Sequence, residues 1–212
     1  MLSNLSYITI VLACLAGMIN FRFLPLYLRI IFLQYCLSLL VESAGYIIAL
    51  KAGANCLLYN TYVICDVILI SIAAIAYDKT LKKYAYPGLA ICFCVWLYNL
   101  YKVENNMLTT WSILVNYLFI TILYTLLLLK NRKTNPLILS GQFTLFCLGI
   151  LVFYAGCIPY FGLFNYFLTQ DKILANKFYD IVHILSVISC ILFIFCFFRN
   201  KREKSLPQPS GL

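Results

Sequence analysis

The sequence predicts an all-α membrane protein, a bundle of seven transmembrane helices with its N-terminus outside and its C-terminus in the cytoplasm. Of the 212 residues, 64% are apolar and only 11% are charged, which is far from the composition of soluble domains. The apolar residues form runs of about twenty residues rather than the short alternating segments of a transmembrane barrel. Because a bilayer core offers the backbone no water, such runs must be helical.

Seven apolar segments are suited to spanning a membrane, and each is bounded by charged residues, proline or asparagine. They cover residues 4–20, 29–49, 57–77, 86–101, 111–129, 138–160 and 178–198. The first has no basic residue ahead of it and no small-residue cleavage pattern, so we expect a retained helix rather than a signal peptide. We divide the chain into a transmembrane domain over 1–198 and a short, basic cytoplasmic tail over 199–212, which we expect to be disordered.

The orientation follows from the Lys and Arg residues, because cytoplasmic loops carry an excess of them. Twelve of the 16 lie on one predicted side: Arg22, Arg29, Lys79, Lys82, Lys83, Lys130, Arg132, Lys133, Arg199, Lys201, Arg202 and Lys204. The other four, Lys51, Lys102, Lys172 and Lys177, lie on the opposite side, which we therefore expect to be outside. The net charge of +9 is thus an orientation signal, and we expect no nucleic-acid partner.

Ten cysteines are scattered singly through the apolar segments, where a thiol behaves as a small hydrophobic group. Cys92 and Cys94 point to different faces of a helix and make a poor metal pair. Cys56 and Cys157 both fall near the predicted outer surface, and a disulfide between them stays open. We expect no metal site and no cofactor.

Ionisable side chains inside the predicted spans are costly, so we expect them to face the bundle interior or a water-filled cavity. Three acidic residues and the only histidine fall there, in the outer half or near the midplane if each residue rises about 1.5 Å along its helix. Helical periodicity aligns further polar side chains with them. We therefore predict one outward-facing polar pocket, with the candidate residues Glu42, Asn60, Asp66, Asn116, Tyr160, Asp180 and His183.

Each ionisable candidate also has a purely structural explanation. Glu42 and Asp66 fit buried, hydrogen-bonded groups that hold helices together. Asp180 fits an acidic residue near a helix N-terminus, which the helix dipole favours. His183, three residues later, is then explained as the hydrogen-bond partner of Asp180. The many tyrosines fit interfacial belts and carry no functional signal by themselves.

Several known membrane chemistries lack their residues here. The segment 178–198 has no lysine for a retinal Schiff base, and a single histidine excludes the three-histidine zinc hydrolases. No serine stands in a Gly-x-Ser context as in rhomboid-type proteases, and no phosphate-binding or dinucleotide motif is present.

Short motifs do resemble those of a known family. They are Gly149-x4-Tyr154, Pro159-Tyr160 and Tyr179-x3-His183 before a closing aromatic run and basic tail, with Glu42-x2-Gly45-Tyr46 and Tyr59-Asn60 upstream. Together they resemble uncharacterised seven-helix integral membrane proteins of Bacteroidetes-type bacteria. The resemblance implies a multi-pass location in the cell inner membrane and a seven-helix count, and it carries no activity.

Three classes of function stay open, as does a purely structural role as a subunit of a larger membrane complex. The first is a sensory or small-ligand-binding module that binds a small periplasmic ligand or cation and signals through a membrane-protein partner. The second is an intramembrane lipid-modifying enzyme, with carboxylates or His183 as acid and base. The third is a proton- or cation-coupled transporter, against which stand the absence of ionisable residues in the inner halves of the spans and of inverted repeats. The lipid bilayer is the one partner that the composition requires.

Overall fold

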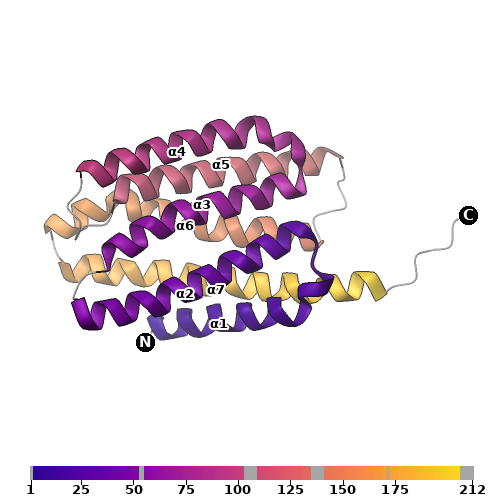
Figure 1. Ribbon diagram of the computed structural model, residues 1–212, viewed down its shortest axis with the longest axis horizontal. Helices are drawn as coiled ribbons and strands as arrows, with labels where there is room; N and C mark the ends of the chain where they lie inside the picture. Colours follow the sequence, from indigo (N-terminus) through magenta and orange to yellow (C-terminus); the bar gives the residue numbers. More distant parts are fainter. Residues whose placement is uncertain (1, 53–54, 103–108, 135–140, 171, 206–212) are drawn as a thin grey trace, which may run out of the picture.

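The computed structural model describes residues 2–52, 55–102, 109–134, 141–170 and 172–205 (Figure 1). Within these ranges the chain forms seven α-helices that run lengthwise along the bundle. They are α1 (Leu2–Asn20), α2 (Leu26–Ala52), α3 (Cys56–Tyr77), α4 (Lys82–Lys102), α5 (Thr110–Thr134), α6 (Gln142–Gln170) and α7 (Lys172–Ser205). We call the end of the bundle where α1 begins the N-terminal end.

Six of the described helices are long and apolar enough to cross a membrane. Their spans are Leu2–Phe23, Leu26–Lys51, Cys56–Tyr77, Thr110–Asn131, Gln142–Phe164 and Lys177–Arg199. The fold is therefore an all-α bundle of the multi-pass membrane type. The helix that falls short is α4, because lysines at both of its ends, Pro87 and Asn99 dilute its apolar stretch. A seventh span thus remains a prediction.

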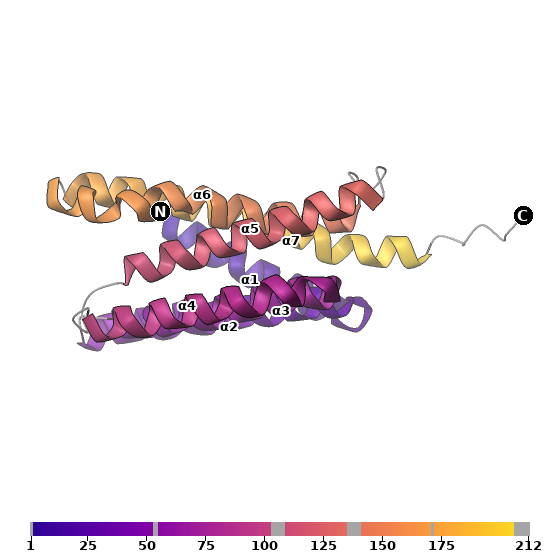
Figure 2. The same cartoon turned by 90° about the horizontal axis from the view of Figure 1, so that it is seen from above.

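The six candidate spans form a closed ring. Along it α1 packs against α2, α2 against α3, α3 against α5, α5 against α6, α6 against α7, and α7 against α1. Helix α4 lies outside the ring, against α3 and α5. Seen from above, α2, α3 and α4 form one layer and α6 and α7 another, with α1 and α5 between them (Figure 2). Six helices therefore contribute side chains to one enclosed interior.

Helix α4 contacts the ring through a narrow stripe. Its buried residues are Ala85, Cys92 and Asn99, which recur every seven residues and so share one face. Beside this stripe Gly88 lies so close to α5 that a Cβ atom there would be 2.0 Å from the Phe119 ring. Most of the remaining surface of α4 is exposed and apolar or aromatic, as expected of a face that meets lipid.

Two predictions about the ends of segments need correction. Helix α7 continues through 199–205, so the expected disorder of the tail is wrong for these residues, which include the good helix formers Lys, Arg and Glu. Residues 206–212 lie outside the described part. The helices on either side of the junction between α6 and α7 are also longer than the predicted spans, since α6 ends at Gln170 and α7 begins at Lys172.

The cysteines, all of which lie in the described part, form no disulfide. The bridge that the sequence left open between Cys56 and Cys157 is therefore not formed. Cys157 is fully buried on α6, whereas Cys56 is partly exposed at the start of α3.

An ion pair fastens the bundle at the end opposite the N-terminal end. Asp78 follows α3, and its Oδ1 accepts hydrogen bonds from the Thr80 backbone N–H at 2.9 Å and from the Thr80 hydroxyl at 2.8 Å. Its Oδ2 forms a salt bridge with the Lys130 Nζ of α5. Partial burial works in the opposite direction, but the hydrogen bonds from Lys130 and Thr80 prevail and lower the pKa of Asp78. The connection between α3 and α4 is thereby tied to α5.

Replacing Asp78 with asparagine is expected to lower the free energy of unfolding at pH 7 by about 1 kcal/mol or less, because the pair is exposed to solvent. Since folding lowers the pKa of Asp78, its contribution is present above the ordinary Asp value of about 4 and is lost as pH falls through the folded value. Thermal unfolding in detergent at pH 7 and near pH 3 should show the difference from the unchanged protein shrinking in acid. An equal difference at both pH values would contradict this, and Asp180→Asn serves as the control.

Candidate functional site

A cavity of about 430 Å³ lies inside the helical ring at the N-terminal end. Its size falls within the range of small-molecule sites, roughly 300–1,000 Å³. All six ring helices line it, and among the described residues neither α4 nor any Lys or Arg does so. The polar lining consists of Ser3, Ser6, Tyr7, Ser38, Glu42, Asn55, Tyr59, Tyr62, Asp66, Tyr117, Tyr179, His183 and Ser186.

Helical periodicity explains why these side chains converge. On α3 the residues Tyr59, Tyr62 and Asp66 stand at positions i, i+3 and i+7 of one stripe. On α7 the corresponding residues are Tyr179, His183 and Ser186, and on α2 they are Ser38 and Glu42. The structure thus places three of the predicted residues, Glu42, Asp66 and His183, on the lining of a single cavity.

Asp66 is the most constrained of the three, and only 5% of it is exposed. Its Oδ2 accepts a hydrogen bond from the Tyr154 hydroxyl at 2.5 Å. Its Oδ1 accepts one from Gln34 Nε2 at 2.8 Å and one from the Tyr62 hydroxyl at 3.4 Å. We call these four residues the Asp66 network. Its donors come from α2, α3 and α6, so the network links opposite sides of the ring.

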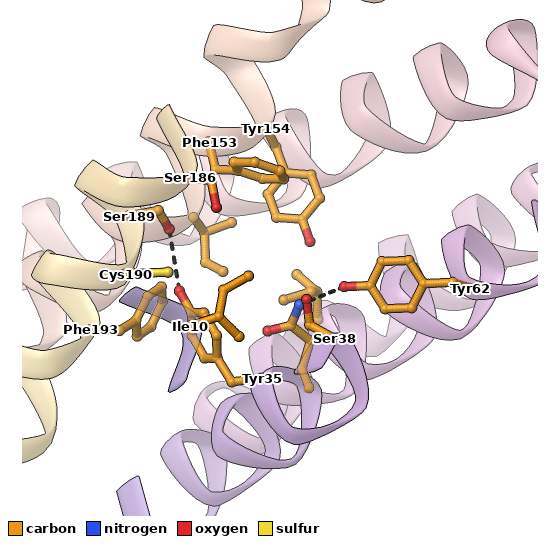
Figure 3. A pocket seen from close by; sticks show the side chains of 13 residues that line it. Ile10, Tyr35, Ser38, Tyr62, Phe153, Tyr154, Ser186, Ser189, Cys190 and Phe193 are labelled. Carbon is orange, nitrogen blue, oxygen red and sulfur yellow. Dashed lines mark hydrogen bonds between the residues drawn. The ribbon is translucent and has the colours of Figure 1, made fainter. Parts of the chain in front are cut away.

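Beneath the main cavity lies a smaller one of about 60 Å³, and the two share five lining residues, among them Ser38, Tyr62 and Phe153. Figure 3 shows the hydroxyl ends of Ser38, Tyr62 and Tyr154 turned toward its interior. On the opposite wall the Tyr35 and Ser189 hydroxyls are 3.5 Å apart. Hydroxyl groups from four different helices therefore form a polar floor below the main cavity.

Glu42 is held by Tyr59, whose hydroxyl donates to Glu42 Oε2 at 3.0 Å. This contact depends on Gly45, because a Cβ atom at that position would lie 2.8 Å from the Tyr59 hydroxyl oxygen. The Gly45 carbonyl in turn accepts a hydrogen bond from Asn55 Nδ2 at 3.1 Å. The Glu42 Oε1 atom accepts no hydrogen bond from the residues that the structure describes. One carboxyl oxygen is thus anchored, and the other keeps its capacity to bind.

His183 is half-buried, and its imidazole packs edge-on against the Tyr179 ring with 4.8 Å between the centroids. Asp180 was also predicted to line the pocket, but it is exposed and is not among the residues that line this cavity. The cavity follows the stripe that begins at Tyr179, and the next residue along a helix points about 100° away. No hydrogen bond joins Asp180 to His183, both of which are described.

Asn60 was also predicted to line the pocket, and the structure instead buries it between helices. Its Oδ1 accepts hydrogen bonds from the backbone N–H and the hydroxyl of Thr109, at 3.0 and 3.1 Å. Its backbone carbonyl accepts one from Trp96 Nε1 at 2.7 Å. Asn60 therefore joins α3 to α4 and to the residue that precedes α5.

Asn116 and Tyr160, which were also predicted to line the pocket, are likewise not among the residues that line the main cavity. Tyr160 is buried among aromatic rings, including those of Phe161, Phe164 and Tyr179. Asn116 is 1% exposed, and neither polar atom of its side chain has a hydrogen-bond partner within the described structure. Both side chains are thus buried in the packing between helices rather than exposed in the main cavity.

Several residues of the two cavities were not predicted from the sequence. Tyr154 and Gln34 complete the Asp66 network, and α1 contributes Ser3, Ser6 and Tyr7. Gln34 lies four residues before Ser38 and eight before Glu42, so helical periodicity could have found it. Helix α1 has no acidic or basic residue and no histidine between Leu2 and Asn20, so the search for such residues in the sequence did not point to it.

The fold and the cavity define the class of this protein as a helical bundle of the membrane type with a polar internal cavity. Comparison of the chain with protein-family models, curated proteins and solved structures gave no match. Within the described residues, no group of three or more His, Cys, Asp or Glu side chains is placed to hold a metal ion. The residues that line the cavity are therefore the basis for the proposed function.

Asp66→Asn is expected to destabilise the protein by about 1–3 kcal/mol, because the new amide N–H₂ would face a donor in the buried network. Tyr154→Phe removes a single donor and should cost less. Since the two residues share one hydrogen bond, the double variant should lose less than the sum of the single losses. Unfolding in detergent measures all three variants, and strict additivity would show that the two side chains do not interact.

Asn116→Leu should raise the free energy of unfolding by about 1 kcal/mol or more, because it removes a buried amide that has no hydrogen-bond partner among the described residues. The matched change Asn60→Leu should lower stability, since it leaves the Thr109 donors unpaired. Thermal unfolding of the two variants under identical conditions provides the comparison. Destabilisation of equal size in both would contradict the assignment of Asn116.

Proposed function

We propose that this protein is a binding module of the cell inner membrane that takes a small periplasmic ligand or cation into the main cavity. One observation carries the proposal. Two carboxyls, an imidazole and five phenols from the ring helices surround a single space of about 430 Å³, and part of their hydrogen-bonding capacity is unused. Burying such groups is costly in a bilayer, so a functional use for them is the default expectation.

The distribution of basic residues supports an outward-facing cavity. Lys51 and Lys102 lie at the ends of α2 and α4, and Lys172 lies at the start of α7, all at the N-terminal end. Lys79, Lys82 and Lys130 lie at the opposite end, as do most other basic residues by sequence. The side richer in Lys and Arg is normally cytoplasmic. The cavity would then face the periplasm.

The place of α4 supports a seventh span. It lies alongside α3 and α5 (Figures 1 and 2), so a membrane that contains the ring would also surround α4. The start of α1 and the end of α7 lie at opposite ends of the bundle, as an odd number of spans requires.

The interior at the opposite end favours binding over transport. Large side chains fill it, and Tyr124, Phe146, Phe193 and Phe197 are almost completely buried there. Their rings contact one another, with centroids 5.4 Å apart for Tyr124 and Phe146 and 6.1 Å apart for Phe193 and Phe197. A ligand that entered the cavity would meet this packed aromatic layer rather than a polar path.

A cavity-filling variant tests the proposal whatever the chemical identity of the ligand. Ser38 lines both cavities, so Ser38→Phe should place a ring in the binding space. Thr125→Phe is the matched control, because Thr125 is exposed on the outer face of α5. Native mass spectrometry after gentle purification should find a small molecule bound to the unchanged protein and to Thr125→Phe but not to Ser38→Phe. Identical spectra for all three proteins would argue against a binding function for the cavity.

A further inference from the structure

The three ionisable groups on the cavity lining differ in what they offer a ligand. Asp66 has donors on both carboxyl oxygens, and its side chain is nearly inaccessible. It holds Tyr62 and Tyr154 in place and has little capacity left for a ligand. Glu42 Oε1 and the His183 imidazole, in contrast, accept no hydrogen bond from the described residues. Glu42 and His183 are therefore the ionisable groups of the lining that keep capacity for a ligand.

Each of these two residues has a tyrosine neighbour. Tyr59 donates its hydroxyl proton to Glu42, and Tyr179 packs against His183. All four side chains line the main cavity. The carboxyl, the imidazole and the two phenols thus form one cluster, which we call the Glu42 cluster.

The Glu42 cluster is rich in acceptors. Tyr59 uses its proton on Glu42, so its oxygen can accept a hydrogen bond, as can a neutral imidazole nitrogen and the second carboxyl oxygen. Tyrosine rings also attract cations through their negative faces. No Lys or Arg among the described residues lines the cavity to compensate a carboxylate. A ligand that brings a positive charge and several N–H donors would satisfy all of these groups at once.

From this arrangement we propose that the group recognised in the cavity is a primary ammonium, held by Glu42 and His183 between the rings of Tyr59 and Tyr179. An ammonium has three N–H donors, matching the three acceptors of the cluster. The proposal rests on the proposed binding function and names its ligand chemistry. A small soluble amine and the headgroup of an ethanolamine phospholipid both present this group.

The soluble arm of the test uses 2-phenylethylamine and 2-phenylethanol, which differ in the amine and hydroxyl groups. Thermal stabilisation of the purified protein in detergent should give a dissociation constant about tenfold lower for the amine at pH 7, because only the amine forms a charge-assisted pair. Glu42→Gln should remove most of this preference and leave the alcohol unaffected. Asp180→Asn, an exposed carboxyl outside the cavity, should keep the preference.

The lipid arm compares bilayer discs of phosphatidylethanolamine and phosphatidylcholine, which have the same net charge. Greater thermal stability in the ethanolamine lipid that Glu42→Gln abolishes would support the proposal and identify a headgroup as the source. Amine selectivity in detergent with no such lipid effect would support it with a soluble amine as the ligand. The comparison of amine and alcohol on the unchanged protein needs no variant, so it holds even if Glu42→Gln does not fold.

Two results would overturn the ammonium proposal. One is equal binding of amine and alcohol together with equal stability in the two lipids. The other is unchanged amine preference in a folded Glu42→Gln variant. In either case, if a small molecule binds the unchanged protein but not Ser38→Phe, the proposed binding function is still supported. If no molecule binds in the cavity in any of these measurements, both proposals are wrong.

Discussion

In a membrane-type bundle, the scarcity of water forces polar side chains to satisfy one another, and the Asp66 network is where this constraint acts most strongly. One buried carboxyl receives hydrogen bonds from Gln34, Tyr62 and Tyr154, which come from three helices. The network sets how far α3 can lie from α6 across the ring. The main cavity lies directly above this network, and Asp66 and Tyr62 belong to both.

The interior of the ring is divided into two unlike halves. Toward the N-terminal end, hydroxyl, carboxyl and imidazole groups line open space, and toward the other end aromatic rings such as Phe146 and Phe193 pack closely. Apolar packing stabilises the bundle without directional bonds, whereas the polar half depends on hydrogen-bond geometry. The closely packed half thus forms a rigid base for the polar half.

The residues of the polar half have different structural roles. Asp66 and Tyr154 hold helices, Gly45 and Asn55 shape the approach of Tyr59, and Glu42 and His183 keep unused acceptors. Residues of similar chemistry therefore have different roles according to how many partners the fold provides. A count of carboxyls in the sequence cannot make this distinction, because it depends on contacts between helices.

Composition and periodicity were sufficient to predict an all-α membrane bundle, the approximate position of each helix and the inward stripe that carries Glu42. Each of these properties depends on residues close together in the sequence, through apolar run length and the helical repeat. The sequence could not show that α4 stands outside the ring, that Asn60 and Asn116 are buried without lining the cavity, or that Asp180 is exposed. These features depend on the rotation of each helix about its axis and on its choice of neighbours. Only packing among all the helices decides both.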